Sequence, residues 1–191
     1  MSDGSFSPTA LYGTAAWIIQ DELTGSELTG CMIIPGQPED LDAYRCELGG
    51  LYGIVVIVDA LCAYHSITSG SITRACDGEQ ALRHATNEYD WISPARPHFD
   101  LIAAIWARNA RTPLKWESKH VKGHQDDCRN AFLDRWAHLN VRMDAQAKVH
   151  LQATIGDSTR ITQQKIAGEP WALWIGDRKV VRKLWEEVIH H

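Results

Sequence analysis

The chain has 191 residues, 45% of them hydrophobic, and a formal net charge of -5 at pH 7. This length suits one domain with an addition, and the hydrophobic content is enough for a real core. The negative charge is not typical of a general nucleic-acid binder, so a nucleic-acid role would need a local basic surface or a partner. The first residues lack the features of a signal peptide, and no apolar run is long enough to cross a membrane, so we expect no membrane partner.

The first half of the chain predicts a hairpin and a long helix. Strands are expected over 13–20 and 28–34, joined by a turn at 21–26. A helix capped by Asp40 or Asp42 should then run through Ala63. Its apolar residues recur at helical spacing on both sides of the strand-like run 54–58, so the helix is favoured there.

The second half alternates strands with helices. Strands are expected over 71–76 and 114–121, and helices over 79–85, over 99–107 and from Leu133 or Ala137 to Leu151. With one further strand leading into Asp3, a hairpin mixed with crossover helices indicates an α/β layered sheet.

The chain divides into three predicted parts. We expect a domain over 1–150, a polar linker over 151–168 and an extension over 169–191. In the extension, Gly176-Asp177 indicates a small β-hairpin, and residues 182–189 indicate a helix. The cysteines are five in number, widely spread and without a CxxC pair. This favours reduced thiols and an intracellular protein, in the cytoplasm or the nucleus.

Acidic residues stand at informative places in this pattern. Each has an ordinary explanation: a turn residue, a solvated helix residue, or a helix cap, as for Asp77 with Gln80. Together they are harder to dismiss, because they lie at the ends of two predicted strands and on two predicted helices. A loop histidine, which can act as a proton shuttle beside carboxylates, follows another strand. The set is Asp3, Glu47, Asp77 and Asp144, with His124 on the loop.

These stretches resemble the type 1 ribonuclease H family over roughly residues 1 to 150. The matching motifs are Ser2-Asp3-Gly4-Ser5, Tyr44-Arg45-Cys46-Glu47-Leu48-Gly49-Gly50-Leu51, Ala75-Cys76-Asp77-Gly78, Val121-Lys122-Gly123-His124 and Asn140-Val141-Arg142-Met143-Asp144. The form from His120 to Asp127 is most similar to ribonuclease H domains of eukaryotic retroelement reverse transcriptases. The resemblance implies a mixed five-stranded sheet with helices on both faces, and cleavage of the RNA strand of RNA/DNA hybrids.

The resemblance also implies the roles of the site residues. Asp3, Glu47, Asp77 and Asp144 would be catalytic metal ligands, and His124 would assist turnover. Two Mg²⁺ ions, for which Mn²⁺ can substitute, would be the cofactors, because hard cations prefer carboxylate oxygen. Carboxylates gathered without metal repel one another, so their pKa values should be raised. Asp134 is the alternative to Asp144 as the fourth ligand.

Contacts to the RNA/DNA hybrid are expected at Gly4, Ser5, Lys119, Lys122 and Arg142. A polymerase domain in the same polyprotein would supply further affinity. Two other readings stay open: a catalytically inactive ribonuclease H-like spacer or interaction module, and a zinc site formed by His120, His124 and Cys128.

The first strand is expected to be largely truncated. In the family it runs for several residues into the catalytic aspartate, whereas only Met1 and Ser2 precede Asp3 here. We therefore expect the natural reading frame to continue upstream with a short apolar, β-branched run. Its absence would leave unpaired strand edges.

Overall fold

The computed structural model describes residues 1–86, 92–93, 95–123, 125–127, 133–157, 163–169, 171–183, 186 and 189. The strands are β1 (Ser2–Ser7), β2 (Tyr12–Gln20), β3 (Glu27–Ile33), β4 (Ser71–Cys76), β5 (Lys115–His120), β6 (Trp174–Ile175) and β7 (Arg178–Lys179). The helices are α1 (Ala43–Tyr64), α2 (Glu79–Ala85), α3 (Phe99–Arg111) and α4 (Arg135–Ile155). All strands and helices predicted between residues 13 and 151 are therefore present; β4 and α2 have the predicted bounds, and the others have shifted ends.

The first three strands form one antiparallel sheet in the order β1-β2-β3. In its registers Ser2 lies opposite Trp17, and Ala16 lies opposite Cys31. Most of β2 is buried, which fits its place in the middle of this sheet. The predicted hairpin of β2 and β3 is confirmed.

The position of Asp3 corrects the prediction that the first strand ends there. Asp3 is the second residue of β1, which continues to Ser7. The reason is that each residue from Ser2 to Ser7 lies opposite a residue of β2, so the antiparallel ladder continues beyond Asp3.

The five main strands are hydrogen-bonded in two groups rather than in one. Strand β4 pairs with β5 in parallel, and the described residues show no pairing of β4 with β1. The strands thus form a three-stranded and a two-stranded ladder, connected by packing.

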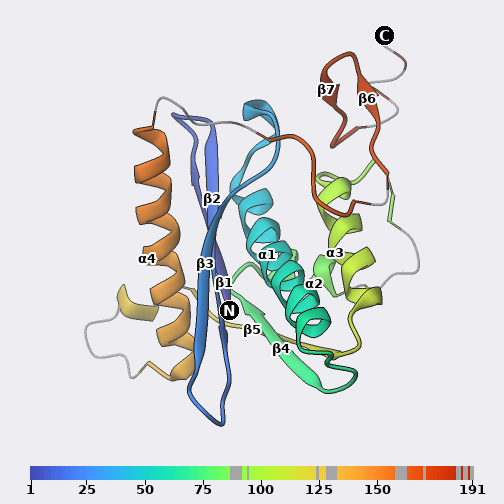
Figure 1. Ribbon diagram of the computed structural model, residues 1–191. Helices are drawn as coiled ribbons and strands as arrows, with labels where there is room; N and C mark the ends of the chain where they lie inside the picture. Colours follow the sequence, from blue (N-terminus) through green and yellow to red (C-terminus); the bar gives the residue numbers. More distant parts are fainter. Residues whose placement is uncertain are drawn as a thin grey trace.

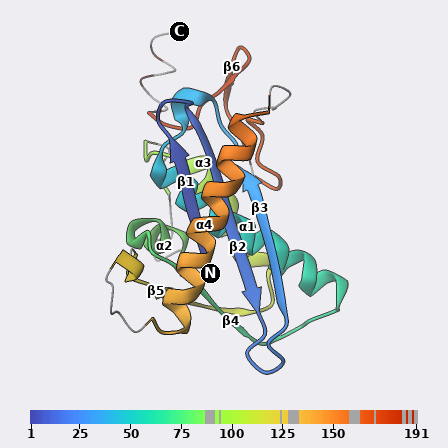
Figure 2. The same ribbon diagram turned by 90° about the vertical axis from the view of Figure 1, so that its left-hand side faces the viewer.

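Helices cover both faces of the three-stranded sheet, as predicted (Figures 1 and 2). Helix α4 lies on one face and α1 on the other, with α3 beyond α1. Asp42 caps α1, and its side chain accepts a hydrogen bond from the Arg45 backbone N–H at 2.7 Å. The main core gathers Leu48, Leu51 and Val55 of α1 with residues of α2 and α3.

Helix α1 also corrects the prediction about membrane spans. By length and composition it could cross a membrane. However, 61% of its most apolar stretch of 18 residues is buried inside the fold. A long core helix has the same composition, because it is apolar nearly all round.

The C-terminal segment, which follows α4, lies against α1 and α3 in its described residues 163–169 and 171–183. Ile166 belongs to the main core, and the His98 backbone N–H donates to the Val181 carbonyl at 3.0 Å. The predicted hairpin is present as β6 and β7. The division into domain, linker and extension stays a prediction, and the predicted helix over 182–189 lies mostly outside the described residues.

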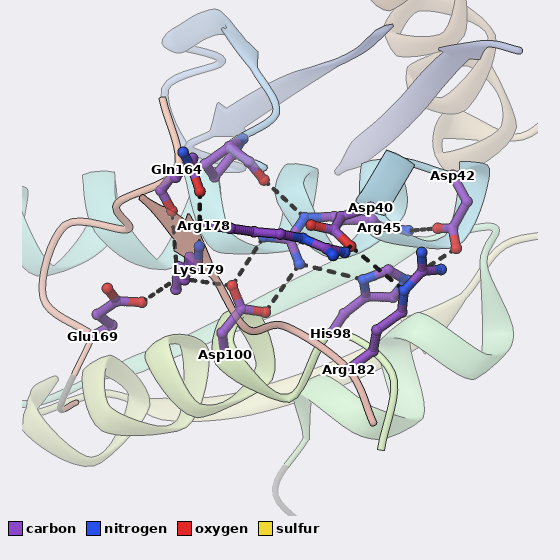
Figure 3. Close-up of polar contacts among 11 residues, drawn as sticks. Asp40, Asp42, Arg45, His98, Asp100, Gln164, Glu169, Arg178, Lys179 and Arg182 are labelled. Carbon is purple, nitrogen blue, oxygen red and sulfur yellow. Dashed lines mark hydrogen bonds and ion pairs between the residues drawn. The ribbon is translucent and has the colours of Figure 1, made fainter. Parts of the chain in front are cut away.

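A buried ion network holds this segment in place (Figure 3). The two terminal guanidinium nitrogens of Arg45, Nη1 and Nη2, donate to Asp100 at 2.9 and 3.0 Å. Lys179 of β7 donates to the same carboxylate at 2.8 Å and to Glu169 at 2.5 Å. Arg45, Asp100 and Lys179 are each at most 2% exposed, so the network connects β7 to the first turn of α1 inside the protein.

Candidate metal centre

Two acidic residues are brought together by a close approach of β1 to α1. A Cβ atom on Gly4 would lie 2.5 Å from the Cys46 carbonyl carbon and 2.6 Å from the Glu47 nitrogen. Only glycine therefore allows the two backbones to come this close. The neighbours of this contact are Asp3 on β1, which is 4% exposed, and Glu47 on α1.

Asp77 follows β4 directly and is not the cap of the next helix. Gly78 occupies the N-cap position of α2, without a side-chain cap. The capping interpretation of Asp77 is thus wrong. Asp77 is instead half-buried, and its buried Oδ1 atom lacks a hydrogen-bond partner. Cys76 Sγ donates to Glu47 Oε2 at 3.2 Å, which connects this strand end to α1.

Helix α4 supplies Asp144 from the opposite side. Asp134 is the N-cap of this helix, and its Oδ1 accepts from the Ala137 backbone N–H at 2.8 Å. Its side chain is therefore engaged in capping. Asp144 pairs with Lys148 one turn further along, at 2.7 Å.

The four acidic residues border one small cleft of about 230 Å³. It is lined by Asp3, Gly4, Ser5, Phe6, Glu47, Asp77, Asp126, Asn140, Val141, Asp144 and Lys148. The structure thus brings together the acidic side chains that the sequence singled out, and it leaves Asp134 out.

The carboxylates of this cleft affect one another electrostatically. Burial, followed by the charges of Glu47, Asp77 and Asp144, raises the pKa of Asp3 to about 9. Burial and the charge of Asp77 raise the pKa of Glu47 to about 7. Ionised carboxylates are destabilised by desolvation and by like charges, so a cation in the cleft would relieve both effects.

The donor set fits a hard divalent cation. Among the described residues, Glu47, Cys76 and Asp77 offer ligand atoms within 4.8 Å of one another. The buried Asn140 Oδ1 at the cleft has no partner either, as for Asp77 Oδ1. Carboxylate and amide oxygens are ligands that Mg²⁺ and Mn²⁺ prefer. The thiol of Cys76 is protonated, since burial raises its pKa well above the usual value.

The predicted nucleic-acid contacts are distributed unequally around the cleft. Gly4 and Ser5 line it. Lys119 and Lys122 are exposed near the end of β5, where the Lys119 ammonium lies 5.6 Å from the ring centroid of Trp136. Arg142 instead pairs with Glu27 of β3 at 2.7 Å. A role for Arg142 in binding would need this ion pair to open.

His124 and Cys128 lie outside the described residues. Gly123, which precedes His124, lies beside Asp77, because a Cβ atom there would be 2.6 Å from Asp77 Oδ2. His120 Nε2 contacts the Asp77 carbonyl at 3.0 Å. The roles of His124 and of the zinc alternative stay predictions.

Sequence reasoning missed three polar residues at the cleft: Asp126, Asn140 and Lys148. A signal for two of them was available. Asn140 and Lys148 lie four residues before and after Asp144, and this spacing puts side chains on one face of a helix.

No protein family model matches the sequence, and no curated protein matches it. Several solved structures are similar, and two of them are described here. One is RNase H1 from the halophilic archaeon Halobacterium salinarum NRC-1, with 16% identity, a TM-score of 0.49, and coverage of 80% of this chain and 95% of that one. The other is the N-terminal RNase H domain of Rv2228c from Mycobacterium tuberculosis, fused to maltose binding protein. Its identity is 16% and its TM-score 0.44, with coverage of 78% of this chain and 94% of that one.

Proposed function

We propose that this protein is a metal-dependent endonuclease that hydrolyses the RNA strand of RNA/DNA hybrids. The observation that carries the proposal is the meeting of Asp3, Glu47, Asp77 and Asp144 at one cleft. They come from a strand, a helix, a strand end and a second helix. The order and form of the motifs that contain them, which resemble type 1 ribonuclease H, support the choice of substrate.

The residues of the cleft have distinct tasks in this proposal. The four carboxylates would hold two Mg²⁺ ions, which would neutralise charge on the attacking and leaving oxygens of a phosphodiester. Asn140 would orient a ligand through its unpaired Oδ1. Lys148 neutralises Asp144 when no divalent cation is held. His124 would carry a proton, a task that contributes on the order of 10²–10⁴-fold in rate.

The proposal also includes a partner domain for this chain. The similarity of the segment from His120 to Asp127 to retroelement reverse transcriptases supports a polymerase domain in the same polyprotein as a partner. The net charge of -5 agrees with this, because an acidic chain gains little affinity for nucleic acid from its overall field. An inactive module remains the alternative, and the presence of all four acids argues against it.

The test is cleavage of a labelled RNA/DNA hybrid by the purified protein with Mg²⁺, beside single-stranded and double-stranded RNA. We expect cleavage of the hybrid alone, to products with a 5′-phosphate and a 3′-hydroxyl. The Asp77→Asn variant should lose this activity and still fold, because Asp77 caps no helix. Glu117→Gln on the exposed part of β5 is the matched control and should keep it.

Two outcomes would contradict the proposal. Equal turnover by Asp77→Asn and the unchanged protein would exclude the acidic cleft as the catalytic site. Cleavage of all three substrates at one rate would exclude hybrid specificity.

A further inference from the structure

The end of β5 holds the end of β4 through a side chain as well as through the backbone. In the parallel ladder of these strands, Cys76 and His120 are the last pair in register. The Val121 backbone N–H donates to the Cys76 carbonyl at 3.1 Å. His120 Nε2 contacts the next carbonyl, that of Asp77, at 3.0 Å. Because a carbonyl oxygen only accepts, Nε2 carries the proton and donates. A side chain therefore prolongs the ladder by one hydrogen bond.

These two bonds hold the peptide units on both sides of the Asp77 Cα atom. The Cys76 carbonyl belongs to the preceding peptide unit, and the Asp77 carbonyl belongs to the following one. The second unit leads into Gly78, which begins α2 without a side-chain cap and has the rotational freedom of a glycine. With both units held, the direction of the Asp77 Cα–Cβ bond is fixed. Without the bond from His120, only the first unit would be held by β5.

The loop after β5 limits the position of the Asp77 carboxylate from another side. A Cβ atom on Gly123 would lie 2.6 Å from Asp77 Oδ2, so the backbone of this loop packs directly against the carboxylate. On the cleft side, Glu47, Cys76 and Asp77 offer ligand atoms within 4.8 Å of one another. Hydrogen bonds that orient a ligating residue commonly determine how well a metal ion is bound. The end of β5 is thus placed to set the position of one carboxylate of the acidic cleft.

We propose that His120 is a positioning residue that keeps Asp77 oriented to bind a divalent cation. This inference deepens the proposed function and rests on it. His120 is exposed and is not among the residues that line the acidic cleft, so it acts through Asp77 and not by touching the substrate. If Asp77 adopts the binding orientation only part of the time, the affinity for the cation falls by that fraction.

The test measures cation affinity in the absence of nucleic acid. Mn²⁺ is titrated into the metal-free full chain, and free Mn²⁺ is followed by electron paramagnetic resonance. His120→Leu, which has no donor, should bind Mn²⁺ about three- to tenfold more weakly, as expected for one lost hydrogen bond. His120→Gln should stay within about twofold of the unchanged protein, because its amide N–H can donate to the same carbonyl.

A matched control comes from the other end of the same strand. The Lys115 side chain is 78% exposed at the start of β5, so Lys115→Leu places leucine on this strand away from Asp77. Its Mn²⁺ affinity should be unchanged. Asp77→Asn, which alters the ligand itself, serves as the reference for a damaged site and should lose more affinity than His120→Leu.

Hybrid cleavage distinguishes positioning from direct contact with the substrate. His120→Leu should raise the Mg²⁺ concentration that gives half-maximal cleavage by the same factor as it weakens Mn²⁺ binding. The rate at saturating Mg²⁺ and the KM for the hybrid should not change, because excess cation selects the binding orientation of Asp77. A lower rate at saturating Mg²⁺, or a changed KM, would mean that His120 touches the substrate and would overturn the inference.

The Mn²⁺ titration separates failure of this inference from failure of the proposed function. Unchanged affinity in His120→Leu together with weakened affinity in Asp77→Asn would overturn the positioning role and leave the metal centre in place. Unchanged affinity in Asp77→Asn would overturn both. Equal weakening in His120→Leu and His120→Gln, with a Zn²⁺ site lost from each, would make His120 a metal ligand and not a positioning residue. Because no hybrid is present, these outcomes hold whether or not the protein cleaves RNA.

Discussion

Asp3 is the residue at which the electrostatic cost of the acidic cleft is highest. Its raised pKa, about 9, means that ionisation is less favourable in the folded than in the unfolded chain. A carboxyl group with a raised pKa stabilises the fold while it is protonated, and this contribution is lost as pH rises from about 4 towards 9. At neutral pH, Asp3 therefore lowers the free energy of unfolding unless a cation is bound in the cleft.

We predict that Asp3→Asn raises the Tm of the metal-free protein at pH 7 and reduces the further rise that Mg²⁺ produces. At pH 7 folding forces Asp3 to take up a proton, a cost that the neutral asparagine does not have, and the substitution removes a ligand as well. Thermal unfolding with EDTA and with increasing Mg²⁺ measures both effects. The exposed Glu117→Gln variant should show neither. An unchanged response of Asp3→Asn to Mg²⁺ would remove Asp3 from the ligand set.

At the scale of elements, the acidic cleft depends on how closely β1 approaches α1. We predict that Gly4→Ala lowers the Tm and abolishes hybrid cleavage, because the new Cβ would lie 2.5 Å from the backbone of Cys46. The strand and helix must then separate, and Asp3 moves away from Glu47. Gly156→Ala at the end of α4 is the matched control, since a Cβ atom there would lie 3.6 Å from its nearest neighbours. Normal activity of Gly4→Ala at an unchanged Tm would show that the cleft tolerates this separation.

Elements with strong local patterns could be predicted from the sequence. Helix α1 follows from its apolar spacing and from a cap at Asp42, although residues 54–58 favour a strand locally. Because the apolar residues on both sides of this run keep the spacing of a helix, the whole segment is helical. The acidic residues could be found because each lies beside a glycine or on a regular helix.

Other features depended on tertiary contacts that no local pattern encodes. The parallel pairing of β4 with β5 joins strands that are far apart in the sequence. The role of Asp134 as a cap could be distinguished from that of a ligand only when the start of α4 was known. Residues 151–168 have a polar composition typical of a linker, and the packing of the residues that follow them depends on the ion network at Lys179. In a sequence, charged residues that form ion pairs across the fold cannot be distinguished from charged residues that face solvent.

At the scale of the whole molecule, the ion network makes stability depend on acidity. Burial alone would raise the pKa of Asp100, but Arg45 and Lys179 lower it to about 2. A carboxylate with a lowered pKa stabilises the fold above its unfolded value, near 4, and this contribution is lost as pH falls towards 2. We predict that the free energy of unfolding, measured with urea, decreases through this window.

A variant of the network tests the same prediction. Lys179→Met should cost about 3–5 kcal/mol, because it leaves buried carboxylates without one of their partners. Lys183→Met removes an exposed ion pair with Glu186 and should cost at most about 1 kcal/mol. Equal costs would mean that the C-terminal segment is not held by its buried charges.

The separation of the strands into two ladders has a consequence for how the molecule opens. Residues 14–17 of β2 have partners in both β1 and β3, whereas the described residues give β4 partners in β5 alone. Amide hydrogen exchange, followed by mass spectrometry, should therefore be slowest in β2 and faster in β4 and β5, through a partial opening below the global free energy. Exchange of all these strands at one rate would instead show that packing on α1 makes them a single cooperative unit.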